Sequence, residues 1–296
     1  MMRLLLALAA IAASPAIGGL LDAGTVGNKF MVTYSIIPDP FHQFSFYSMP
    51  RTVSEAKKDS FSQVTSNDED KTTVWCRKND YRVCVLFDQQ GSVAGIQVSI
   101  REAELTSKDS ASFGGLSTLL TPEWRRQLFL GKDVWTATAY FVSKEVLLSG
   151  GRKMDKNTPT APEGIFVQQV DIDNKETGRL AVSSTEAEAT AAGFTEQACF
   201  YGMGKHYFQE LSKTSKCENH RPYFLLYGPK TKKMNGFGFT WYGKPSQGRG
   251  WFEAPPALVA KQIAPNSPDC MSKWINKYGM FTLHVFFVDR PWYTMC

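Results

Sequence analysis

Histidine is the side chain of this sequence best suited to hold a metal or move a proton, because imidazole ligates metals and titrates near neutral pH. The chain has four histidines, which are His42, His206, His220 and His284. Secreted copper or zinc enzymes usually need roughly three imidazole ligands per metal, or imidazole together with carboxylate. Four histidines cannot supply two such sites, so a duplicated two-copper monooxygenase is disfavoured.

A single metal site remains an alternative. Met203 and His206 lie in the Gly-flanked segment 202–207, which predicts a turn, and His284 lies in a predicted strand. If the turn and the strand meet, these three side chains converge, and a thioether with two imidazoles suits copper. The interpretation that the sequence favours is that both histidines are ordinary core or surface residues, and the sequence identifies no cofactor.

Motifs of nucleophilic and nucleotide chemistry are missing from the sequence. It contains no G-x-S-x-G segment, no P-loop and no G-x-G-x-x-G segment that opens a helix. If all cysteines are paired, no thiol is left for Cys/His catalysis. The sequence therefore leaves open whether the protein is an enzyme.

Aromatic side chains are the best remaining candidates for ligand binding. They make up 13% of the chain, and several lie among glycines of the second half, where rings offer a large contact area at a low entropy cost. Phe237 and Phe239 alternate along a predicted strand, which favours core packing. The side chains that we predict to contact a ligand are Trp241, Tyr242, Trp251, Phe252 and Tyr207.

The charge balance gives no indication of a nucleic-acid partner. Lys and Arg number 33 against 28 Asp and Glu, a net charge of +5. A nucleic-acid-binding domain has a stronger, patterned basic surface, so we expect none. Hydrophobic residues at 43% and charged residues at 21% also exclude a disordered chain.

Residues 1–18 have the layout of a secretory signal peptide. Arg3 precedes the apolar run 4–13, and small residues follow it. The run is too short for a membrane-spanning helix, which needs about 20 residues, and no later segment runs long enough without charge. We therefore expect a secreted, extracellular protein without a transmembrane segment.

The six cysteines favour disulfides, since an even count in an oxidising compartment allows full pairing. No C-x-x-C pair and no zinc-finger spacing compete with this interpretation. Six cysteines allow many connectivities, so the sequence does not determine the pairing. Pairing of neighbours along the chain predicts the disulfides Cys76–Cys84, Cys199–Cys217 and Cys270–Cys296.

An internal repeat organises the elements that must position these side chains. The matching blocks are Cys76 with Cys217, Gly95 with Gly236, 46–49 with 200–203, and 135–142 with 281–288. Blocks in a common order are what duplication of a whole domain leaves. We therefore predict a first β-rich domain over 19–150, a linker with a strand and a short helix over 151–195, and a second β-rich domain over 196–296.

Local patterns indicate which elements build these domains. Apolar and aromatic runs between turn residues predict strands at 30–37, 81–87, 93–100, 135–142, 164–170, 223–227, 236–241 and 281–288. Start and stop signals predict short helices at 122–130, 184–197 and 270–278. The expected fold is mainly β with a few short helices, built as two tandem, internally duplicated antiparallel β-sheet domains.

The leading functional prediction is a secreted, disulfide-stabilised two-domain binding protein. Its extracellular ligand is a glycan or an apolar small molecule, held by aromatic and Gly-rich loops. One alternative is a secreted oxidase or monooxygenase-type enzyme with a single metal site, and another is a venom, defence or extracellular-matrix component. The sequence does not indicate the oligomeric state.

Overall fold

The computed structural model describes residues 27–33, 45–105, 120–182, 184–246 and 250–296. The predicted signal peptide, His42 and half of the strand expected at 30–37 lie outside these ranges. Strands dominate the described residues and every helix among them is short, which confirms the predicted mainly-β fold class.

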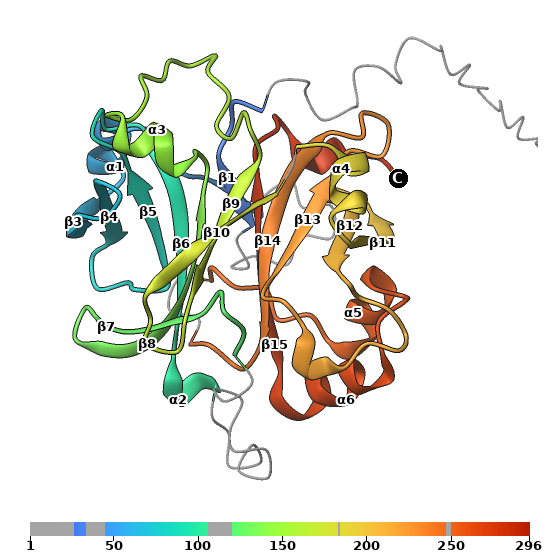
Figure 1. The fold of residues 1–296 in the computed structure, drawn as a ribbon. Helices are drawn as coiled ribbons and strands as arrows, with labels where there is room; N and C mark the ends of the chain where they lie inside the picture. The colour runs from blue at the N-terminus through green and yellow to red at the C-terminus, as the bar shows by residue number, and fades with distance from the viewer. Residues whose placement is uncertain (1–26, 34–44, 106–119, 183, 247–249) are drawn as a thin grey trace, which may run out of the picture.

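Two antiparallel sheets pack face to face (Figure 1). The eight-stranded sheet has the order β10-β9-β8-β6-β5-β4-β3, with β7 also on β8. Its strands are β3 (Phe61–Asn67), β4 (Thr72–Arg77), β5 (Val83–Phe87), β6 (Val93–Arg101), β7 (Arg125–Phe129), β8 (Lys132–Tyr140), β9 (Ile165–Val170) and β10 (Glu176–Val182). The seven-stranded sheet consists, in spatial order, of β11 (Phe194–Phe200), β12 (Gly204–Gln209), β13 (Tyr223–Tyr227), β14 (Met234–Tyr242), β15 (Met280–Phe286), β1 (Met31–Thr33) and β2 (Phe46–Ser48).

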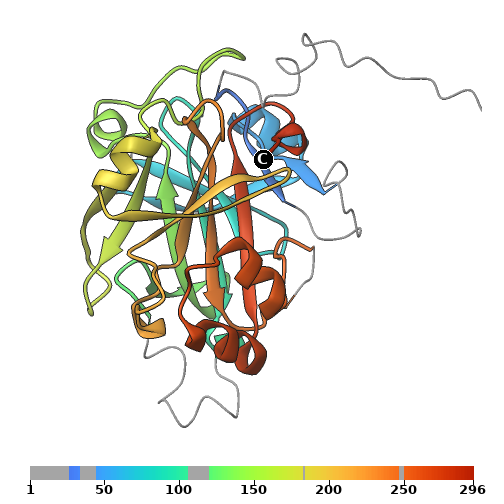
Figure 2. The same cartoon turned by 90° about the vertical axis from the view of Figure 1, so that its right-hand side faces the viewer.

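Short helices connect and cover the strands. Those in the described residues are α1 (Val53–Lys58), α2 (Glu102–Leu105), α3 (Lys144–Leu148), α4 (Glu186–Ala191), α5 (Ala257–Ile263) and α6 (Asp269–Tyr278). The last two lie against the outer face of the seven-stranded sheet, as Figures 1 and 2 show. One face of the seven-stranded sheet therefore packs against the eight-stranded sheet, and the other face packs against α5 and α6.

The two sheets repeat one order of elements. In each, a short helix (α1 or α4) precedes a run of neighbouring strands, β3-β4-β5-β6-β8 in one and β11 to β15 in the other. The two sheets differ in the strands that follow this run in space. In the eight-stranded sheet they are β9 and β10, and in the seven-stranded sheet they are β1 and β2. Part of the expected linker therefore belongs to the first sheet, and the N-terminal strands pair in the second. Common ancestry of the halves and the domain boundaries stay predictions.

The main core lies between the sheets. Phe141 and Phe237 approach from opposite sheets with ring centroids 6.2 Å apart, within one cluster that also holds Val85, Ile96 and Val285. The central strands are buried on both faces, so they are continuous apolar runs and not alternating ones. Every residue of β13 and of β15 is buried.

The predicted helix at 122–130 is wrong. Thr121 and Pro122 start a turn, and β7 follows as one arm of a hairpin with β8. Leu130 and Gly131 take positive φ angles of 50° and 69°, which is the conformation of a tight hairpin turn. The helix expected at 184–197 is confined to α4, after which the chain enters β11. The helix expected at 270–278 is confirmed as α6.

All six cysteines lie in the described part of the chain and none of them is free. The disulfides are Cys76–Cys84, Cys199–Cys296 and Cys217–Cys270. The first predicted pair is confirmed and the other two are wrong. Pairing by nearness along the chain fails there because the strand order places Cys199 of β11 beside the chain end, and Cys217 beside the first turn of α6.

Candidate functional site

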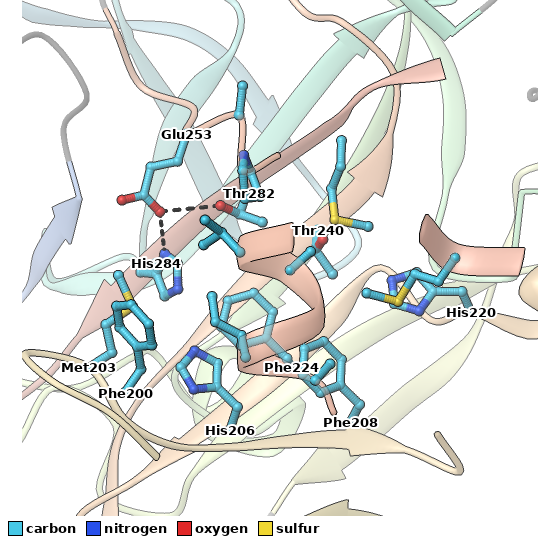
Figure 3. Close-up of a pocket in the computed structure, with 18 residues that line it drawn as sticks. Phe200, Met203, His206, Phe208, His220, Phe224, Thr240, Glu253, Thr282 and His284 are labelled. Atoms are coloured by element: carbon cyan, nitrogen blue, oxygen red, sulfur yellow. Dashed lines mark hydrogen bonds and ion pairs between the residues drawn. The ribbon is translucent and has the colours of Figure 1, made fainter. Parts of the chain in front are cut away.

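A cavity of about 460 Å³ lies between the outer face of the seven-stranded sheet and the two C-terminal helices. Its apolar lining consists of Phe200, Met203, Phe208, Phe224, Ala254, Pro255, Val259, Ala260, Ile263, Ala264, Met271 and Met280. Its polar lining consists of His206, His220, Thr240, Glu253, Thr282 and His284. Strands β12, β13, β14 and β15 contribute Phe208, Phe224, Thr240 and His284, which Figure 3 shows among the side chains around the cavity.

Strand register places the sheet residues on one face. Phe208 pairs with Phe224, Phe224 with Gly238, and Gly238 with His284, so four neighbouring strands form a row across the sheet. Gly238 is required in this row, because a Cβ there would come within 2.1 Å of the Phe224 ring. The missing side chain lets the Phe224 ring lie flat over β14 and form the floor of the cavity.

His284 is held by a carboxylate. Its Nδ1 lies 2.7 Å from Oε2 of Glu253, close enough for an ion pair although not aligned as a hydrogen bond. The Thr282 hydroxyl donates to the same oxygen over 3.2 Å, and the backbones of Glu253 and Thr282 exchange two hydrogen bonds of 2.9 Å. A carboxylate at Nδ1 favours the tautomer with its proton there, which leaves Nε2 as an acceptor.

His206 lies beside His284 with the two ring centroids 5.9 Å apart and the rings nearly perpendicular. It stacks on Phe224 at 5.5 Å. Burial, and then the neighbouring His284, lower the pKa of His206 to about 3, so its imidazole is neutral at neutral pH. Neither ring nitrogen has full hydrogen-bond geometry to a described residue. The backbone groups of Ala198 and Gly204 lie near enough to raise the pKa of His206, but burial and His284 outweigh them.

His220 lies apart from this pair, on the other side of the cavity in Figure 3. Its ring stacks on Trp241 at 5.8 Å. Burial lowers the pKa of His220 to about 4, and its Nε2 has no hydrogen-bond partner among the described residues. The cavity thus combines an apolar lining with buried, neutral imidazoles that can still form hydrogen bonds.

The structure brings the three predicted metal-binding side chains, Met203, His206 and His284, to this one cavity. Met203 comes from the turn between β11 and β12, but His206 lies in β12 and not in a turn. Within the described ranges, no group of three or more His, Cys, Asp or Glu side chains is placed to hold a metal ion. Metal binding by this set stays a prediction.

The five predicted ligand-binding rings are interior residues. At most 1% of the surface of each is exposed, and none of them lines the cavity; they are Trp241, Tyr242, Trp251, Phe252 and Tyr207. Trp251 Nε1 donates to Asp80 over 2.8 Å, and the Tyr207 hydroxyl donates to Glu186 over 2.6 Å. Ligand binding by these rings stays a prediction, and the geometry moves the candidate site to the cavity.

Sequence reasoning missed Glu253 and the whole of α5. A signal for the helix was present, because Pro256 precedes the segment Ala257–Ile263, in which apolar residues recur at helical spacing. No comparable signal marks Glu253, since its pairing with His284 depends on a bridge between segments distant along the chain. The pairing of Glu253 with His284 therefore appears only in the folded chain.

Comparisons with known protein families, with curated proteins and with solved structures found no match for this chain. The site is therefore interpreted from its own geometry. Over the described ranges, none of the helices has the length and apolar character needed to cross a membrane. The three disulfides are typical of proteins in an oxidising, extracellular compartment.

Proposed function

We propose that the protein is a secreted binding protein that carries one small apolar molecule in the cavity between the seven-stranded sheet and helices α5 and α6. The observation that carries this proposal is the lining, which is mainly aliphatic, aromatic and thioether surface with a few inward polar groups. Ligand pockets have this composition, in which apolar contacts supply affinity and a few polar groups supply orientation.

The volume limits the size of the ligand. At about 30 Å³ of liquid volume for each non-hydrogen atom, taken from water, 460 Å³ holds a molecule of about 15 such atoms. A glycan of that size carries several hydroxyl groups, and each buried hydroxyl needs a partner. Twelve of the eighteen lining residues are apolar and would face those hydroxyl groups without a partner, so the cavity favours an apolar molecule over a sugar.

A dye-binding experiment tests this proposal. We expect 1-N-phenylnaphthylamine, a neutral dye of suitable size, to bind at one molecule per chain with a fluorescence increase. Ala260→Phe fills the cavity from α5, because Ala260 lines it, and this variant should weaken dye binding at least tenfold. Leu258→Phe is the matched control, since Leu258 lies on the same helix but is 73% exposed.

The results separate the alternatives clearly. Saturable binding that Ala260→Phe weakens and Leu258→Phe leaves unchanged supports the proposal. Absence of saturable binding, or equal binding by a folded Ala260→Phe variant, overturns it. Circular dichroism shows whether each variant is folded.

A single-metal enzyme is the second candidate, because Met203, His206 and His284 line the same cavity. Elemental analysis of the purified protein tests it. Stoichiometric copper that is lost in a His206→Leu variant would support this candidate, and protein without stoichiometric metal after exposure to copper would exclude it.

A further inference from the structure

We propose that the ligand is a neutral amphiphile whose head group is a hydroxyl, and that His206 and His284 bind this hydroxyl together. The inference rests on the proposed function and adds the chemical class of the ligand. It follows from the charge of the lining, from the hydrogen-bonding positions of the two imidazoles, and from the place where they meet.

The charge of the lining disfavours an anionic ligand. Glu253 is the one charged side chain among the described lining residues, which include no lysine and no arginine. A ligand carboxylate bound beside the imidazoles would lie near Glu253 without a fixed cation to balance it. Desolvation of an unpaired charge is far more costly than desolvation of a hydroxyl, so the cavity selects against fatty acids and phosphate esters.

The two imidazoles offer complementary hydrogen-bonding positions. Glu253 lies 2.7 Å from Nδ1 of His284, which directs the proton of a neutral ring to that nitrogen and makes Nε2 an acceptor. His206 is neutral and keeps one N–H donor. A hydroxyl both donates and accepts, so it can donate to Nε2 of His284 and accept from the N–H of His206.

His206 is a buried polar side chain that faces the cavity. The side chain is 1% exposed, and neither ring nitrogen has a hydrogen-bond partner among the described residues. Unpartnered buried polar atoms are uncommon because each costs stability. In Figure 3 the His206 ring lies on the side of His284 away from Glu253, where a bound oxygen could reach both rings.

The apolar part of such a ligand has room in the same cavity. Phe224 and Phe208 continue the lining from the His206–His284 pair toward His220, as Figure 3 shows. Met271 adds a thioether to the same lining. A chain of about 12 carbons with one hydroxyl matches the size estimated from the cavity volume. The matched probes are therefore 1-dodecanol, dodecanoate and dodecylammonium, which share one chain and differ in the head group.

Displacement of 1-N-phenylnaphthylamine by these probes at pH 7.5 tests the inference. We expect 1-dodecanol to bind at least tenfold more tightly than dodecanoate, which is an anion. We expect the same against dodecylammonium, because an ammonium group has no acceptor for the N–H of His206. His206→Leu should weaken dodecanol binding about tenfold more than it changes binding of the dye, the effect of losing one good hydrogen bond. Phe208→Leu is the control on the same strand and face, and it should weaken all probes alike.

Each outcome has a distinct meaning. Tightest binding of dodecanoate or dodecylammonium, or an unchanged dodecanol preference in His206→Leu, would overturn the hydroxyl assignment while dye binding leaves the carrier proposal intact. Loss of all dye binding in the wild-type protein would instead contradict the carrier proposal itself. Partial recovery of the dodecanol preference by His206→Asn, which restores a donor and an acceptor, would support the assignment.

Discussion

Replacing His206 with leucine should make the ligand-free protein more stable, although most buried substitutions destabilise proteins. The His206 ring is buried and neither of its nitrogens has hydrogen-bond geometry to a described residue. An unsatisfied buried polar group costs about 1–3 kcal/mol, and leucine has a similar volume without that cost. We expect the free energy of unfolding to rise by about 1–2 kcal/mol at pH 7.5.

The same substitution should flatten the acid side of the stability profile. The pKa values are about 3 for His206 and about 4 for His220 in the folded chain, against about 6.5 in the unfolded chain. Because both pKa values are lowered on folding, the free energy of unfolding is highest above pH 6.5. It falls as the pH drops below 6.5 toward the folded-state pKa values of about 4 and 3. At pH 5 each histidine lowers the free energy of unfolding by about 2 kcal/mol relative to pH 7.5, because only the unfolded chain binds the proton.

Urea unfolding measures both effects, followed by tryptophan fluorescence at pH 7.5, 6.5 and 5.0 with the disulfides intact. Between pH 7.5 and 5.0, His206→Leu should lose about 2 kcal/mol less than the wild type. Carboxylates, including Glu253 beside His284, contribute to both proteins and cancel in this difference. Phe208→Leu should lower stability equally at all three pH values.

Two results would refute the reasoning. A His206→Leu variant that is less stable than the wild type at pH 7.5 would mean that the imidazole is well satisfied in the folded chain. A wild-type pH dependence retained in the variant would mean that His206 does not titrate below its unfolded pKa.

Two further predictions concern the scaffold. Removing the disulfide between Cys199 and Cys296, which are 97 residues apart, should lower the free energy of unfolding by about 5 kcal/mol. Removing the disulfide between Cys76 and Cys84, which are 8 residues apart, should lower it by about 3 kcal/mol. Equal losses in urea unfolding would contradict the argument that a longer closed loop gives more stability. Arg179→Met leaves the buried Asp70 carboxylate without its partner at 2.7 Å and should cost about 3–5 kcal/mol. A loss below about 1 kcal/mol in the same assay would show that water or another group replaces the guanidinium.

Much of the fold could be predicted from the sequence where it depends on local chemistry. The strands at 223–227 and 236–241 are confirmed, because short apolar and aromatic runs bounded by turn residues favour strands. The helix that ends at Gly279 is confirmed as well, since glycine at a φ of 82° ends a helix without strain. The disulfide Cys76–Cys84 could also be predicted from the local sequence, because its cysteines lie opposite each other on adjacent strands.

The candidate site could be predicted only in part. His284 was placed in a predicted strand, and its proximity to His206 was raised only as a condition. Both now line one cavity. The aromatic rings expected at a binding loop, such as Trp241 and Trp251, are interior residues instead. The sequence gives the type of a residue but does not show which part of the structure packs over it.

By itself, the sequence determined the class of the fold, the positions of most central strands and the presence of disulfides, since each rests on residue types and short spacings. The tertiary structure alone decided which cysteines pair and that 122–130 contains a hairpin strand in place of a helix. It also decided that α5 and α6 lie over the row of Phe224 and His284 and form a cavity there. These features depend on strand order and layer packing, which bring together residues far apart in the chain, and no local pattern encodes that proximity.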